Sequence, residues 1–98
     1  MFHTIDQIKR ANSNNGHHWF DPNNMRFFHS RVGETVYHVG ERSLFVSSEC
    51  REPGETPRRY TIHEANDDGS IDTIGEFQQY ASRARAIAAI RLLQRGTV

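Results

Sequence analysis

Residues 34–47 carry the sequence ETVYHVGERSLFVS, in which apolar and polar side chains alternate on both sides of a glycine. A period of two residues is typical of β-strands, because successive side chains point to opposite faces of a sheet. Gly40-Glu41 fits a two-residue hairpin turn with the glycine first. The stretch therefore predicts two antiparallel strands joined by a tight turn.

The chain that follows this hairpin predicts further strands. Two prolines and a glycine within residues 51–57 indicate a loop, and residues 59–63 have the composition of a strand. Residues 66–69, Asn-Asp-Asp-Gly, indicate a turn, after which residues 71–77 pair back. We expect an antiparallel meander of three to four strands within residues 27–77.

A helix is predicted on the N-terminal side of this sheet. Residues 4–7 have the form of a capping box, and Ile5, Ile8 and Ala11 follow at steps of three residues. Gly16 supplies the left-handed residue that commonly ends a helix. These signals place a helix at about residues 5–13.

A second helix is predicted at the C-terminal side. Ser82 is a typical N-cap residue, and Gly96 ends the helical pattern. Between them an apolar stripe recurs at spacings of three and four residues, formed by Ala86, Ala89, Ile90 and Leu93. The pattern predicts a helix at about residues 82–95.

The order of elements is helix, meander, helix, which predicts an α+β fold. A chain of 98 residues rarely divides its core, so we expect one domain spanning residues 1–98. Each helix must bury its apolar stripe against the sheet. We expect a two-layer sandwich in which both helices cover one face of the sheet and leave the other face exposed.

The neutral net charge hides an uneven distribution of charge along the chain. Residues 1–33 sum to +2, residues 34–76 to −6 and residues 77–98 to +4. A neutral protein with this pattern can present a basic surface to phosphates or to an acidic protein. The candidate basic contacts are six arginines: Arg83, Arg85, Arg91, Arg95, Arg58 and Arg59.

Helical geometry places Arg91 and Arg95 on one flank of the last helix and Arg85 on the opposite flank. A solvated helix face is the alternative interpretation of these arginines. Arg58 and Arg59 extend the basic surface only if their strand lies beside the end of the helix.

The acidic middle of the chain offers a second candidate surface. Its carboxylates would mimic phosphates toward a nucleic-acid-binding groove, and ordinary solvated loops are the alternative. The candidates are Glu49, Glu52, Glu55, Asp67 and Asp68.

The sequence contains no motif for catalysis or for a cofactor. There is no G-x-S-x-G or S-x-x-K pattern, and the glycines stand where turns need them. The six histidines do not form an H-x-x-x-H or H-E-x-x-H pair, and there is one cysteine. We therefore expect no enzyme activity, no catalytic residue, no cofactor and no metal site. If a metal site formed, its first ligands would be His17 or His18 together with Asp21.

The same composition argues for a cytoplasmic protein without membrane contact. No apolar run approaches the length of about 20 residues that a membrane span needs. The first ten residues lack the apolar stretch of a secretory signal. Cys50 has no second cysteine to pair with, which suits a reducing compartment.

Four aromatic residues lie within ten positions: Trp19, Phe20, Phe27 and Phe28. Such a cluster is usually part of a core, because each ring buries a large apolar area. A hydrophobic docking surface is the alternative, and the sequence leaves the two open.

The order of helix, strands and helix resembles the double-stranded-RNA-binding domain, in which a serine-and-basic segment leads into an alanine-rich last helix, as residues 82–86 do here. The resemblance spans about residues 4–96 in topology and about 15 residues in motif. The basic cluster of that family is reduced here to Arg83 and Arg85, and the acidic middle of the chain would repel phosphate. The resemblance therefore concerns the fold and does not by itself imply RNA binding.

Four other runs resemble small uncharacterised proteins encoded by phages and plasmids: MRFFHSR at 25–31, LFVSSE at 44–49, RRYT at 58–61 and GEFQQY at 75–80. This resemblance implies a non-enzymatic protein that regulates or blocks host nucleic-acid machinery, including CRISPR complexes. We therefore expect an accessory protein of a mobile element that binds and occludes a host protein or nucleoprotein complex. The alternative is direct binding of DNA or RNA through the arginines of the last helix. A homodimer formed through an open sheet face or edge is a third possibility.

Overall fold

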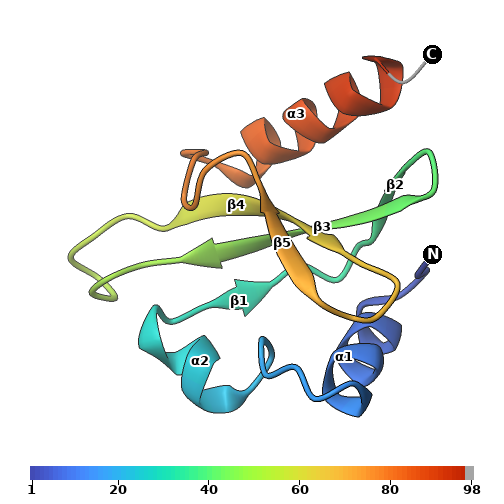
Figure 1. Ribbon diagram of the computed structural model, residues 1–98. Coiled ribbons are helices and arrows are strands. Elements are labelled where there is room, and N and C mark those ends of the chain that lie inside the picture. Colours follow the sequence, from blue (N-terminus) through green and yellow to red (C-terminus); the bar gives the residue numbers. More distant parts are fainter. Residues whose placement is uncertain (97–98) are drawn as a thin grey trace.

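The computed structural model describes residues 1–96 (Figure 1). It contains three helices and an antiparallel sheet, as the α+β prediction required. In chain order the elements are α1 (Ile5–Asn14), α2 (Pro22–Phe27), β1 (Arg31–Val32), β2 (Tyr37–Val39), β3 (Arg42–Glu49), β4 (Arg59–Ala65), β5 (Ile71–Ile74) and α3 (Arg83–Gly96).

Helix α1 begins at the predicted capping box. The backbone N–H of Gln7 donates to Thr4 Oγ1 over 3.2 Å, and Gln7 Oε1 accepts from the backbone N–H of Thr4 over 3.2 Å. These reciprocal bonds satisfy amides that the first turn leaves without partners. Gly16, just beyond the helix, has a φ of +77°, so the predicted helix and its stop are confirmed.

Helix α2 was not predicted from the sequence, because Asp-Pro-Asn-Asn at residues 21–24 also favours a turn. Asp21 is its N-cap, and Asp21 Oδ1 accepts from the backbone N–H of Asn23 over 2.9 Å. Pro22 follows at the first helical position, where a missing N–H carries no penalty. The Asp-Pro pair is therefore a helix start, a signal present in the sequence.

The sheet is the predicted antiparallel meander with one additional strand. Its order is β1-β3-β4-β5, and β2 also pairs with β3. Strands β1 and β2 share the edge of β3 that β4 leaves free, so together they occupy one strand position. Val39 pairs with Arg42 across the predicted Gly40-Glu41 turn, and Gly40 has a φ of +61°.

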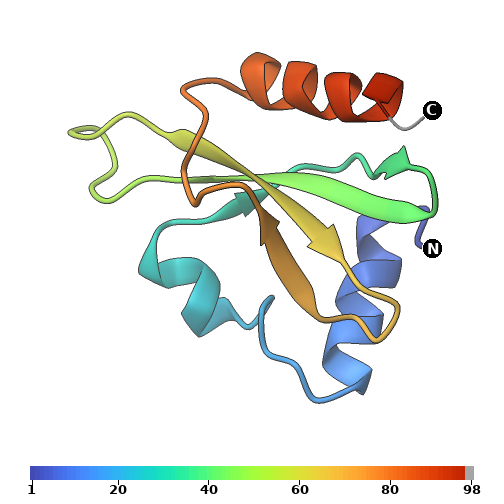
Figure 2. The ribbon, with the colours of Figure 1, turned by 45° about the horizontal axis from the view of Figure 1, so that its top comes forward.

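The prediction that both helices cover one face of the sheet is wrong. Helix α3 lies on one face of the sheet, and α1 and α2 lie on the other, which gives three layers (Figure 2). Leu44 and Val46 pack with Ala86 and Ile90 of α3, whereas Phe45 between them packs with Ile5 and Ile8 of α1.

The cause of this arrangement is visible in β3. Leu44, Phe45 and Val46 are consecutive, so strand alternation sends large apolar side chains to both faces of the sheet. Burying each of them contributes about 1.5–3 kcal/mol, so neither face is left open to water. All three side chains are buried.

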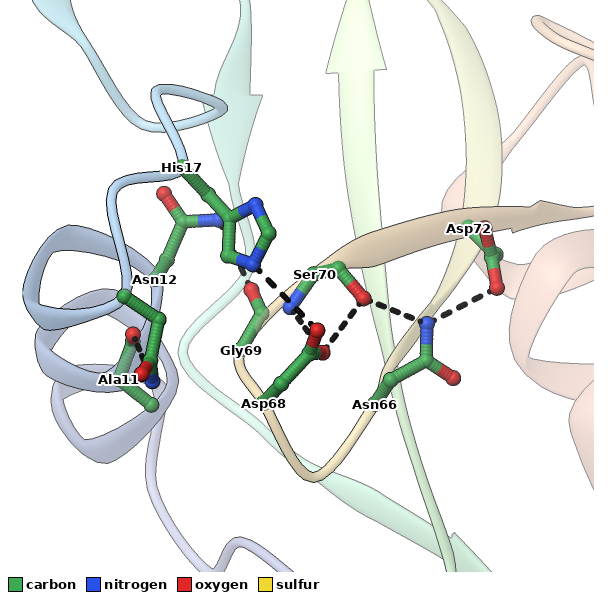
Figure 3. Close-up of polar contacts among 9 residues, drawn as sticks. Ala11, Asn12, His17, Asn66, Asp68, Gly69, Ser70 and Asp72 are labelled. Atoms are coloured by element: carbon green, nitrogen blue, oxygen red, sulfur yellow. Dashed lines mark hydrogen bonds and ion pairs between the residues drawn. The ribbon is translucent and has the colours of Figure 1, made fainter.

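The turn between β4 and β5 lies against the backbone of α1 (Figure 3). Asn12 is buried, and its Nδ2 donates to the carbonyl of Gly69 over 2.8 Å. Asp68 Oδ1 accepts from the backbone N–H and from Oγ of Ser70. His17 Nε2 lies 3.5 Å from the other carboxylate oxygen of Asp68. The turn is therefore a joint between the N-terminal helix and the sheet.

Candidate functional site

A row of side chains lies on the face of the sheet that α3 covers, beyond the first turn of that helix. The row consists of Arg31, Ser48 and Tyr60. The register pairs Arg31 with Ser48, and Ser48 with Tyr60. Residues directly opposite each other in a sheet point to the same face. Since Ser48 lies two and four residues beyond Val46 and Leu44, this row shares the face that α3 covers.

Arg83 reaches the same place from the helix. It lies seven residues before the buried Ile90, close to two full turns, so it projects toward the sheet. Its Nη2 atom is 3.6 Å from the position a Cβ would take at Gly33. That same Cβ would lie 3.2 Å from the carbonyl oxygen of Val46. A side chain at position 33 would therefore be tight against the Val46 backbone and in ordinary contact with the guanidinium of Arg83.

These residues line a pocket of about 190 Å³, called here the α3-face pocket and formed chiefly by Arg31, Gly33, Val46, Ser48, Tyr60 and Arg83. No carboxylate of the described residues lines it. Within residues 1–96, the guanidinium groups of Arg31 and Arg83 take part in no ion pair or hydrogen bond. The pocket therefore holds two positive charges that the described residues do not neutralise.

Arg58, a predicted basic contact, is committed to internal hydrogen bonds. Its guanidinium donates to Ser48 Oγ over 3.0 Å and to the Ser48 carbonyl over 2.7 Å. It also donates to the His29 carbonyl over 2.7 Å and to Cys50 Sγ over 3.3 Å. Arg58 therefore fastens the end of β3 to the segment after α2.

We predict that Arg58→Ala lowers the free energy of unfolding by about 2 kcal/mol, because it leaves the part-buried carbonyl and hydroxyl oxygens of Ser48 without their donor. Urea denaturation followed by Trp19 fluorescence measures this change. Arg51→Ala is the matched control, since Arg51 is exposed in the same loop, and we expect a change below about 0.5 kcal/mol. Equal stability of the two variants would contradict the structural role of Arg58.

The other predicted basic residues separate into two groups. Arg59 is used internally, because its guanidinium donates to the carbonyls of Gln78 and Gln79 over 2.7 and 2.9 Å. Arg85, Arg91 and Arg95 are exposed on α3, and within residues 1–96 they form no ion pair or hydrogen bond. The free arginines therefore line the helix rather than the start of β4.

The predicted acidic residues do not form one surface. Glu49 is 2% exposed, so the prediction that it belongs to an acidic surface is wrong. Glu52 and Glu55 lie in the loop before β4, and Asp67 and Asp68 lie in the turn after it. The seven residues of β4 place these pairs about 20 Å apart, at opposite ends of the sheet (Figure 1).

Local hydrogen bonds modify two of these carboxyl groups. A bond with Glu55 raises the pKa of the Glu52 carboxyl. The two bonds from Ser70 lower the pKa of the Asp68 carboxyl, and His17 adds a smaller effect in the same direction. The bonds between Ser70 and Asp68 are the turn chemistry that short polar residues provide.

The four neighbouring aromatic residues divide between core and surface. Trp19 and Phe20 pack with Phe45, with ring centroids 5.6 and 5.9 Å from it. Phe27 is 75% exposed, and Phe28 contacts both Phe27 and the 48% exposed Phe77. Phe27 and Phe77, joined through the half-buried Phe28, form an exposed aromatic cluster. The sequence alone did not separate Phe27 and Phe28 from the core.

A group of polar side chains is buried between the sheet and the N-terminal helices. Ser47 Oγ and His63 Nε2 are 2.7 Å apart, and Thr61 Oγ1 donates to Glu49 Oε1 over 3.0 Å. Among residues 1–96, His63 Nδ1 and Glu49 Oε2 have no hydrogen-bond partner. All four side chains are at most 2% exposed, so the Ser47–His63 pair is closed to a substrate in this structure.

Burial changes the titration of both ionisable groups in this cluster. It lowers the pKa of His63 to about 4, with the backbone of Asp72 offsetting part of the effect. Burial raises the pKa of the Glu49 carboxyl, against opposing hydrogen bonds from Ser47 and Thr61 and the positive charge of Arg58. Both groups are therefore biased toward their neutral forms.

Residues 1–96 contain no group of three or more His, Cys, Asp or Glu side chains placed to hold a metal ion. No helix among them has the length and apolar character needed to cross a bilayer.

Sequence reasoning did not single out Arg31 or Gly33. No local signal marks them, because their role depends on β1 pairing with the distant end of β3. The short β1 strand of two residues has no period that a sequence pattern can detect.

The comparisons with known proteins give a family. No curated protein and no solved structure matches the chain. The resemblances to phage and plasmid proteins and to the double-stranded-RNA-binding domain stay predictions. The model of one family matches residues 4–91, from the capping box of α1 to Arg91 in α3. The chain belongs to the family of unknown function DUF7447.

Proposed function

We propose that this chain is a non-enzymatic domain that binds nucleic acid, free or within a nucleoprotein complex, through the arginines on its α3 side. The observation that carries the proposal is that Arg85, Arg91 and Arg95 are exposed and without partners among residues 1–96. Helix α3 contains no carboxylate that would compete for them.

Arginine is well suited to this role. Its planar guanidinium pairs with two oxygens of one phosphate, and it is less strongly hydrated than an ammonium group. Contacts of this kind position a protein on a nucleic acid without reading its sequence. We therefore propose binding with little sequence preference, in the cytoplasm.

We predict that binding depends steeply on salt and on the α3 arginines. With about three phosphate contacts, the logarithm of the affinity should fall with the logarithm of salt concentration with a slope of about −2 to −3. Fluorescence anisotropy with labelled mixed-sequence DNA and RNA, at about 50 and 200 mM salt, measures this slope. The double variant Arg91→Glu/Arg95→Glu should lose binding, because it places two negative charges where phosphates would lie.

The matched control reverses the same number of charges on the other side of the sheet. Arg10 in α1 and Arg26 in α2 are exposed, so Arg10→Glu/Arg26→Glu changes the net charge equally. We expect this control to bind within about threefold of the native protein, since its charges lie away from α3. Equal loss in both double variants, or absence of binding at low salt, would count against nucleic-acid binding through α3.

A protein partner is the second candidate, favoured by the exposed aromatic cluster of Phe27, Phe28 and Phe77. Exposed aromatic groups are enriched at protein interfaces, where their burial supplies much of the binding energy. In this alternative the chain is the accessory protein expected from its sequence, which occludes a host protein. Phe27→Ser/Phe77→Ser should then abolish capture of an identified host protein, while Arg91→Glu/Arg95→Glu should not.

A further inference from the structure

We propose that the α3-face pocket is a binding site for a phosphomonoester, meaning a phosphate group with one ester link and two negative charges. The proposal rests on the proposed function only for the source of this group, which is either the end of a nucleic-acid strand or a free mononucleotide. The chemistry of the site is argued from the pocket itself.

The donors that line the pocket match the oxygens of such a group. Arg31 and Arg83 enter from β1 and α3, and each offers N–H groups that the described residues do not use. Ser48 Oγ already accepts a hydrogen bond from Arg58 Nε over 3.0 Å, so its own O–H is free to donate. Tyr60 also lines the pocket.

The charge and the volume of the pocket restrict the class of ligand further. The two unneutralised guanidinium groups balance a phosphomonoester, which carries a charge of about −1.5 to −2 at neutral pH. The volume of about 190 Å³ is below the roughly 300–1,000 Å³ of pockets that enclose a drug-sized ligand. The pocket therefore suits one phosphate group, with the rest of the ligand outside.

Two other pockets on the molecule lack this excess of positive charge. One of about 430 Å³ combines Lys9 with the carboxylates of Asp6 and Glu34. The other, of about 290 Å³, combines Lys9 with the carboxylate of Asp21. Their carboxylates oppose an anion, whereas the lining of the α3-face pocket contains none.

A titration of the native protein followed by NMR tests the site. Inorganic phosphate and a 5′-mononucleotide should both shift the backbone resonances of Arg31, Gly33 and Ser48 and the side-chain resonances of Arg83. Arg83→Gln should weaken this binding by about tenfold or more, because it removes a charge-assisted pair of hydrogen bonds. The matched control is Arg10→Gln, an exposed arginine of α1 on the other face of the sheet, which should leave the affinity for both probes unchanged.

A pair of oligonucleotides that differ only at the 5′ end separates the two sources. If the 5′-phosphorylated strand binds the native protein about tenfold more tightly than the 5′-hydroxyl strand, and Arg83→Gln removes the difference, the site holds a strand end. If the two strands bind alike while the mononucleotide still shifts the pocket, the ligand is a free phosphorylated small molecule.

The result that would overturn the phosphomonoester site differs from the result that would overturn the proposed function. Absence of shifts in the pocket at about 10 mM phosphate and mononucleotide would rule out the phosphomonoester site, because affinity would then be weaker than millimolar. So would equal affinity of the native protein and Arg83→Gln for these probes. Loss of strand binding in Arg91→Glu/Arg95→Glu would still support the proposed function in either case.

Discussion

Replacing Gly69 with alanine should lower the free energy of unfolding by about 2–5 kcal/mol, because two independent penalties add. Gly69 has a φ of +83°, where a Cβ atom by itself costs about 1–2 kcal/mol. The Cβ would also lie 2.4 Å from the backbone carbon of Ala11 and 2.4 Å from the backbone nitrogen of Asn12. Backbone atoms cannot rotate away as a side chain can, so α1 must move off the turn.

The second penalty extends beyond the turn itself. A displaced α1 would weaken the hydrogen bond from Asn12 Nδ2 to the Gly69 carbonyl, which is buried. It would also loosen the packing of Ile5 and Ile8 on Phe45. Urea denaturation, monitored by Trp19 fluorescence and by circular dichroism, measures the sum of these effects.

Gly54→Ala is the matched control for this experiment. Gly54 has a φ of +85°, almost identical to that of Gly69, and a Cβ there would meet no atom of residues 1–96 within 4 Å. Gly54→Ala therefore reports the conformational penalty alone, about 1–2 kcal/mol. If the two variants lost the same stability, the close contact between this turn and α1 would not exist in solution.

Local signals account for most of the fold that could be predicted. The capping box at Thr4, the N-cap at Ser82 and the turn at Gly40-Glu41 each act within a few residues, and each is confirmed. The start of α2 at Asp21-Pro22 is equally local, and it was missed because the same residues also favour a turn. Prediction was therefore limited here by competition between two local signals.

The placement of the helices required information that no short segment contains. A meander with two apolar helices fits both a two-layer and a three-layer arrangement. The run Leu44-Phe45-Val46 favours the latter, because it needs cover on both faces of β3. The candidate site was harder still, since Arg31 and Arg83 are 52 positions apart and meet only through strand pairing and the direction of α3.

The charge-based predictions failed in part for a related reason. A tally of charges assumes that charged side chains are free, but Arg58 and Arg59 are used to hold loops against the sheet. Glu49 is buried beside Thr61, although its sequence neighbours are polar or charged. Exposure and hydrogen bonding, which depend on tertiary structure, decide which charges remain available to a partner.

Acid should destabilise this protein by protonating His63 in the unfolded chain. The pKa of His63 is about 4 in the folded state and 6.5 in the unfolded state, so between these pH values the unfolded chain binds more protons. The stability contributed by neutral His63 is thus present above about pH 6.5 and is lost as pH falls toward 4. The loss amounts to about 2 kcal/mol by pH 5 and about 3 kcal/mol by pH 4.

His63→Gln removes this titration while keeping a polar group near Ser47 Oγ, which lies 2.7 Å from His63 Nε2 in the native protein. We expect the free energy of unfolding of this variant to fall by about 2 kcal/mol less than that of the native protein between pH 7 and pH 5. Urea denaturation at a series of pH values supplies both curves.

Glu49→Gln is the control within the same cluster, and its effect has the opposite sign. Because the pKa of the Glu49 carboxyl is raised in the folded state, its contribution to stability is lost as pH rises, not as it falls. Glu49→Gln should therefore stabilise the protein near neutral pH and retain the loss at acid pH that His63 causes. Parallel curves for the native protein and His63→Gln from pH 7 to pH 4 would show that His63 is not buried in its neutral form. The two substitutions thus separate the acid-sensitive member of the buried polar cluster from the base-sensitive one.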